Sequence, residues 1–266
     1  MAATDAPPSA STVPSLEIAE GRALVRLNRP AEHNRLEPDD LDRLREIFAE
    51  VAERNDCRVL VLTGTGKSFS SGFHIGALAD RQDGRVSDYD PDAFEKTVDR
   101  LEALPVPTIA ALNGGVYGGA TDLALACDFR VGVEGMRMFM PAARLGIIYY
   151  ESGLRRYVTR LGLNNAKRLF LTAAPVGADE LLRMEYLNDM VPADQLYERV
   201  DELAAQIAAN APLSLVSLKK ALNDLAAGTF DSDWHAQARE LCAASADHQE
   251  GLKAWKEKRK PDFAGR

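Results

Sequence analysis

Residues 107–122 read PTIAALNGGVYGGATD, and residues 58–74 read RVLVLTGTGKSFSSGFH. Each stretch is a short apolar run followed by a glycine-rich loop. Glycine lets a backbone turn sharply and approach a ligand closely, because it has no Cβ. Two such loops can aim two backbone N–H groups at one point, which is the arrangement that a developing oxyanion needs. The pair of loops therefore predicts a reaction type as well as a fold.

Composition limits the class of protein. The chain has 266 residues, 46% of them hydrophobic, and a net charge of −8, which indicates a globular protein that does not bind nucleic acid. Its three cysteines are widely spaced and form no Cys-x-x-Cys pair, so reduced thiols in a cytoplasmic protein are expected. Residues 1–15 resemble a disordered tail rather than a secretion signal. No apolar run approaches the length of a membrane span.

Strands and helices alternate in the first half of the chain. Compact apolar runs predict strands, and 3–4-residue apolar spacing predicts helices. The expected strands are 23–27, 58–63, 108–112 and 129–133, and the expected helices are one beginning at Pro38, 93–104 and 119–126. A polar loop is expected at 78–92. Only helices follow, at 153–160, 164–172, 178–186, 194–209, 213–227 and 232–258. We therefore expect an α/β core followed by a helical region.

Three familiar sites are excluded by spacing. GTGKS at residues 64–68 is not a phosphate-binding P-loop, because Val61 occupies the position of the required first glycine. The dinucleotide pattern Gly-x-Gly-x-x-Gly is absent from both loops, and so is the Gly-x-Ser-x-Gly motif of serine hydrolases. The four histidines show no metal-ligand spacing, so no metal is expected.

The residues of the two loops suggest the chemistry. If a helix begins at Gly119, its N–H is left without a helical acceptor and can bind an anion. Phe73, directly after Gly72, is placed to supply a second N–H. Together they would polarise a thioester carbonyl and stabilise its enolate. Asp122 lies about one turn into the helix, where it could move a proton or merely favour the helix N-terminus by its charge.

In ordered pieces from residue 16 to the C-terminus, the chain resembles the crotonase (enoyl-CoA hydratase/isomerase) superfamily. The matching pieces are Leu27–Pro30 with Asn34, Leu60–Gly64, Phe69–Phe73, Ile109–Gly114, Gly118-Gly119, Leu123–Asp128, Leu145–Ile147 and Glu257–Phe263. The resemblance implies a spiral of ββα units over residues 16–200, with an acyl-CoA cleft. It implies a helical assembly region over 201–266 that forms homotrimers or hexamers, and no cofactor besides the CoA thioester substrate.

The resemblance also assigns residues by position. Phe73 and Gly119 match the two oxyanion-hole amides, and Asp122 matches the first catalytic carboxylate. Ser71, His74, Ile75, Gly76 and Gly118 belong to loops that lie along the substrate, and Arg35 lies in another stretch that lines CoA. The basic C-terminal segment, with Lys256, Lys260 and Phe263, resembles one that meets the nucleotide end of CoA. A solvated run of charges is the alternative for that segment.

Two departures bear on the reaction. Hydratases of this family have glutamates at positions 122 and 142, where this chain has the shorter Asp122 and the inert Ala142. Tyr149, Tyr150 or Glu151 could restore the missing group, or the tyrosines could only shape the acyl pocket. Isomerisation, C–C cleavage and hydration with a relocated acid all remain open. The alternatives to enolate chemistry are a CoA-binding relative without activity and a structural trimer that docks onto RNA or protein through its basic tail.

Overall fold

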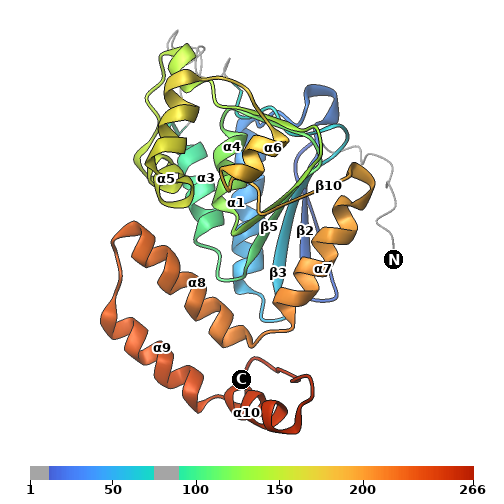
Figure 1. Cartoon of the computed structure of the whole chain (residues 1–266), viewed down its shortest axis with the longest axis vertical. Helices are drawn as coiled ribbons and strands as arrows, with labels where there is room; N and C mark the ends of the chain where they lie inside the picture. The colour runs from blue at the N-terminus through green and yellow to red at the C-terminus, as the bar shows by residue number, and fades with distance from the viewer. Residues whose placement is uncertain (1–11, 75–89) are drawn as a thin grey trace.

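A six-stranded sheet runs through the centre of the molecule in the computed structural model, which describes residues 12–74 and 90–266 (Figure 1). Its strands, in spatial order, are β1 (Ser15–Ala19), β2 (Arg22–Leu27), β3 (Val59–Gly64), β5 (Thr108–Leu112), β7 (Phe129–Val133) and β10 (Asp189–Val191). β1 and β2 pair antiparallel, and all other neighbours pair parallel. β3 and β5 are buried along their whole length, as expected of strands covered on both faces.

A smaller sheet repeats the order of the large one. It contains β4 (Ser68–Ser70), β6 (Gly115–Tyr117), β8 (Arg137–Phe139) and β9 (Val176–Gly177). β4, β6 and β8 pair parallel in the same sequence as β3, β5 and β7. β3, β5 and β7 are thus each followed by one strand of the small sheet and then, in the described part of the chain, by a helix. This repetition confirms the expected spiral of ββα units.

Helices cover the sheets and carry the residues of the site. They are α1 (Pro38–Glu53), α3 (Ala93–Glu102), α4 (Ala120–Ala126) and α5 (Glu151–Thr172), with the short 3₁₀ turns η1 (Pro30–Glu32) and η2 (Ala142–Leu145). α1 begins with Pro38 and a reciprocal capping pair formed by Glu37 and Asp40, which satisfies backbone donors at its first turn. α3 packs against α1, α4 and α5. This packing brings α3 and the start of α5 together beside the glycine loops.

The second half is helical, with two breaks. It contains α6 (Ala178–Arg183), η3 (Ala193–Gln195), α7 (Leu196–Ala208), α8 (Pro212–Ala227), α9 (Ser232–Ala244) and α10 (Ala246–Glu257). Gly162 is non-helical, with φ of 75°, so α5 has the two segments that the sequence predicts. The single helix expected at 232–258 is wrong, because Ser245 ends α9 and its hydroxyl caps α10.

The edges of the expected regions need correction. Ser15 already lies in β1 and pairs with Arg26, so the ordered core begins before residue 16. The expected boundary between 200 and 201 falls inside α7, where Val200 and Ala204 are both buried and the helix packs on β3, β5 and β7. α8, α9 and α10 lie below the sheet in Figure 1. Residues 1–11 and most of the loop expected at 78–92 lie outside the described residues. None of the described helices is long and apolar enough to cross a membrane.

Candidate functional site

A cavity of about 680 Å³ opens where the two glycine loops meet α3 and the start of α5. Among the described residues, its wall is mostly apolar, with six aromatic side chains and two carboxylates. The lining residues are Ser71, Phe73, Pro91, Asp92, Phe94, Glu95, Tyr117, Gly118, Gly119, Phe139, Met140, Pro141, Ala142, Leu145, Ile147, Ile148, Tyr149 and Tyr150. An apolar cavity with few polar groups is typical of a small-molecule site.

The two glycine loops touch inside this cavity. Gly72 has φ of 89°, and a Cβ there would lie 2.5 Å from the carbonyl oxygen of Tyr117 and 2.9 Å from the nitrogen of Gly119. Only glycine permits this close approach. Gly119 precedes α4, and its carbonyl accepts the Asp122 N–H at 3.0 Å. The backbone beside Phe73 is fixed by a parallel bridge to Leu36. The structure therefore brings Phe73 and Gly119 to one wall, as the sequence predicts.

Asp122 does not face the cavity. Its side chain is fully buried and is absent from the cavity lining. The guanidinium of Arg156 holds both carboxylate oxygens, with Nε 3.0 Å from Oδ1 and Nη2 2.9 Å from Oδ2. The hydroxyl of Tyr150 donates a further hydrogen bond to Oδ2. The expectation that Asp122 reaches the acyl chain itself needs correction, because Tyr150 lies between the carboxylate and the cavity.

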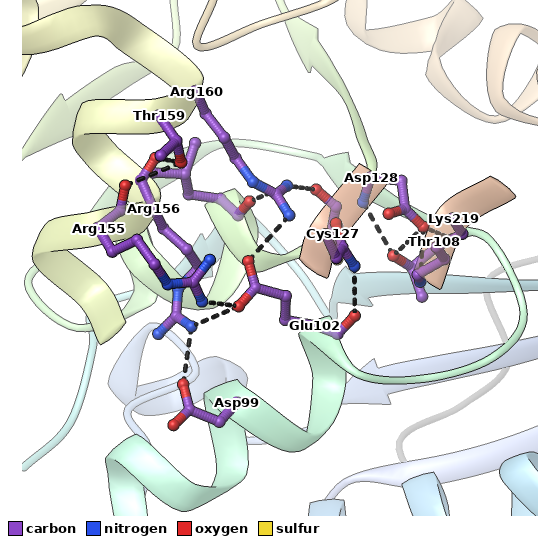
Figure 2. A network of polar contacts seen from close by, with 12 residues as sticks. Asp99, Glu102, Thr108, Cys127, Asp128, Arg155, Arg156, Thr159, Arg160 and Lys219 are labelled. Carbon is purple, nitrogen blue, oxygen red and sulfur yellow. Dashed lines mark hydrogen bonds and ion pairs between the residues drawn. The ribbon is translucent and has the colours of Figure 1, made fainter. Parts of the chain in front are cut away.

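Arg156 belongs to a buried ionic network between α3 and α5 (Figure 2). Its side chain is fully buried and also pairs with Asp99 at 2.7 Å and with Glu102 at 3.0 Å. Glu102 accepts from Arg155 and Arg160 as well. Burial alone would raise the pKa of Glu102, but Arg156, Arg160 and Arg155 outweigh it and lower that pKa. The network fixes the position of Asp122 and hence of Tyr150.

Tyr149 and Tyr150, at the start of α5, also line the cavity. Their rings stack with centroids 4.4 Å apart, and the Tyr150 ring meets Phe94 edge-on at 6.2 Å. Burial, followed by the negative charge of Asp122, raises the pKa of both phenols well above the usual value. The Tyr150 hydroxyl therefore stays protonated and can donate a hydrogen bond, but it is a poor source of a phenolate base.

The other predicted site residues differ in whether they line this cavity. Ser71 and Gly118 line the cavity. Arg35 and His74 are absent from its lining and share the carboxylate of Glu37, at 2.7 and 3.0 Å. Glu151 is the exposed first residue of α5 and is absent from the cavity lining. The suggestion that it replaces the missing carboxylate finds no geometric support.

The C-terminal predictions lie elsewhere in the chain. Phe263 lines a different cavity between α8, α9 and α10, and Lys260 is exposed; neither lines the first cavity. Ile75 and Gly76 fall outside the described residues. The described residues contain no cluster of His, Cys, Asp or Glu suited to a metal ion.

Sequence reasoning missed two residues of the site. Arg156 could have been found, because it lies on the same helical face as the buried Gly153 and Tyr157, where a charged residue requires a partner. Glu95 carries no such signal. It lies in no motif, and only the tertiary packing of α3 places it in the cavity wall.

Known proteins resemble this chain along almost its whole length. A family model described as enoyl-CoA hydratase/isomerase matches residues 17–266. Crotonyl-CoA hydratase of Syntrophomonas wolfei is 32% identical over 252 residues, covering 93% of this chain and 96% of that protein. 2,3-Dehydroadipyl-CoA hydratase of Escherichia coli is 32% identical, covering 91% and 95%. The crystal structure of an enoyl-CoA hydratase from Bacillus anthracis superimposes with a TM-score of 0.83 at 30% identity, covering 95% and 99%.

Proposed function

The chain belongs to the enoyl-CoA hydratase/isomerase family, and from this premise we propose that it binds an acyl-CoA thioester and stabilises the enolate of that thioester. The observation that carries the proposal is the contact between the two glycine loops at the cavity wall, where Gly72 lies against the nitrogen of Gly119. The thioester oxygen would accept hydrogen bonds from the N–H groups of Phe73 and Gly119. One such donor is worth about 10²–10³ in rate.

Tyr150 supplies the hydroxyl that faces the acyl chain. The Arg156–Asp122 ion pair holds it in place, and its raised pKa keeps it protonated. Its one hydroxyl hydrogen is donated to Asp122, so Tyr150 orients the acyl chain through its ring and its hydroxyl oxygen, while Asp122 acts through Tyr150 as a positioning residue. The base that removes a proton from the substrate must come from another element.

The altered acid–base set favours a proton shift over hydration. Ala142 lines the cavity at the position where a second glutamate would help to hold and activate water. A methyl group can neither bind nor deprotonate water. An enolate that forms and is reprotonated at another carbon needs no activated water, so double-bond isomerisation is the reaction that this cavity supports best.

The CoA moiety and the assembly follow the family pattern in this proposal. Ser71 lines the cavity, and Arg35 and His74 are joined through Glu37; in this proposal the three residues would line the path of CoA. α8 exposes Leu218, Leu222 and Leu225, each at least 59% exposed, and their spacing places them on one face. This face supports assembly into the homotrimer or hexamer that the resemblance implies.

The direct test is exchange of the α-protons of saturated acyl-CoA thioesters in deuterated water, followed by mass spectrometry. We expect wild type to exchange them, and Tyr150→Phe to slow exchange by about 10²-fold because the acyl chain loses the hydroxyl that orients it. Tyr197→Phe is the matched control, because Tyr197 lies on α7 and is absent from the cavity lining. A wild type that binds CoA thioesters but exchanges no α-proton across a panel of acyl groups would contradict the proposal and support CoA binding without activity.

A further inference from the structure

α3 presents four carboxylates at helical spacing, Asp92, Glu95, Asp99 and Glu102. The last two form ion pairs with arginines of α5. Asp99 pairs with Arg156, and Glu102 pairs with Arg155, Arg156 and Arg160 (Figure 2). Glu95 forms no ion pair with any residue in 12–74 or 90–266. Its only hydrogen bond to those residues comes from the Ser152 hydroxyl, at 3.4 Å.

Glu95 lies in the cavity wall, next to the corner where the glycine loops meet. It follows Phe94, whose ring is so close to Gly119 that a Cβ on that glycine would lie 2.6 Å away. The same ring lies 5.9 Å from that of Phe73 and 6.2 Å from that of Tyr150. A half-buried carboxylate that forms no ion pair with the described part of the chain thus borders the same space as the two amides and the tyrosine hydroxyl.

We propose that Glu95 is the catalytic base of this enzyme, a role that rests on the enolate chemistry proposed above. The Glu95 carboxylate takes a proton from the acyl chain, and the C–H electron pair moves onto the thioester oxygen, held by the Phe73 and Gly119 amides. The protonated Glu95 then returns the proton to a carbon of the acyl chain. Return at a different carbon shifts a double bond. Return at the same carbon regenerates the substrate, and it gives exchange when the Glu95 carboxyl has first traded its proton for a deuteron of the solvent. No other reactant is consumed.

The surroundings of Glu95 suit a group that takes and returns a proton. Its pKa is raised above the ordinary value, first by burial and then by the negative charges of Asp99 and Asp92. The Ser152 hydrogen bond and the positive charge of Arg156 act in the opposite direction and are weaker. A base whose pKa moves toward neutrality binds a proton more readily at working pH. Asp122 is not available to take a proton in this way, because the guanidinium of Arg156 binds both of its carboxylate oxygens.

Asp92 provides the matched control. It is the other carboxylate in the cavity lining, it lies three residues earlier on the same side of α3, and it is exposed. Asp92→Asn removes one negative charge from the cavity, as Glu95→Gln does, but leaves the proposed base in place. Glu95→Asp retains a carboxylate on a shorter side chain.

The test measures α-proton exchange and acyl-CoA dissociation constants for these variants of the full chain. We expect Glu95→Gln to slow exchange by about 10²–10⁴-fold, with acetoacetyl-CoA binding within about threefold of wild type. Asp92→Asn, which removes only a charge that helps to raise the pKa of Glu95, should slow exchange far less than Glu95→Gln does, and Glu95→Asp should exchange faster than Glu95→Gln. Retained binding shows that the variants are folded.

Two results overturn the inference in different ways. If wild type exchanges α-protons and Glu95→Gln does so within threefold of it, Glu95 is not the base and the proposed function stands. If wild type exchanges none, the proposed function fails and the role of Glu95 fails with it. Loss of acetoacetyl-CoA binding in Glu95→Gln would also overturn the inference, because the side chain would then act in binding.

Discussion

Replacing Asp122 by alanine tests the buried ion pair on which the position of Tyr150 depends. The Asp122 and Arg156 side chains are both fully buried and joined by two hydrogen bonds. Removing one partner of a buried ion pair costs about 3–5 kcal/mol. Asp99 and Glu102 remain beside Arg156, so the lower end applies, about 3 kcal/mol. A chain of this size loses about 2–4 °C in Tm for each kcal/mol.

The assay is urea unfolding followed by circular dichroism, with two further variants. Asp122→Asn keeps one acceptor oxygen for Arg156 and should cost about 1.5–3 kcal/mol. Asp99 pairs with the same arginine, but the Asp99 side chain is 42% exposed. Asp99→Asn should therefore cost less than about 1 kcal/mol. If Asp122→Ala lies within 1 kcal/mol of wild type, or costs no more than Asp99→Asn, the account of the buried pair is wrong.

Three further predictions concern the site, the ionic network and the assembly. Gly119→Ala keeps an allowed backbone but places a Cβ 2.6 Å from the Phe94 ring, so kcat should fall about 10²-fold while the protein stays folded; unchanged kcat would contradict the role of this wall. The lowered pKa of Glu102 makes a contribution to stability that is present above its ordinary pKa and lost as pH falls through the lowered value. The stability difference between wild type and Glu102→Gln should therefore shrink from pH 6 to pH 3, and a constant difference would refute this. Leu222→Glu, which charges the exposed face of α8, should lower the mass measured by sedimentation, whereas an unchanged mass would count against assembly through that face.

The long, buried elements could be predicted from the sequence. TIAAL at Thr108–Leu112 and FRVGV at Phe129–Val133 form strands with the expected bounds, because apolar runs of this length suit a strand covered on both faces. The three-residue strands β4, β6 and β8 were not predicted, since they are too short to show any periodicity. Their pairing is set by the larger sheet beside them.

The site could be predicted only where glycine marks it. The loops at Gly72 and Gly119 are recognisable because their backbones must approach closely. The charged groups are different, because their roles depend on residues far away in the chain. Asp122 lies 34 residues from Arg156, and nothing in either segment shows that the arginine removes this carboxylate from the cavity. Glu95 becomes part of the site only through the packing of α3 against α4 and α5.

A crystal structure with acetoacetyl-CoA, a stable mimic of the enolate, tests the central claim most directly. The account predicts that the thioester oxygen lies about 2.7–3.1 Å from the backbone nitrogens of both Phe73 and Gly119, with the acyl chain between Tyr150 and Glu95. A thioester oxygen bound elsewhere, or one that contacts neither nitrogen, would contradict it.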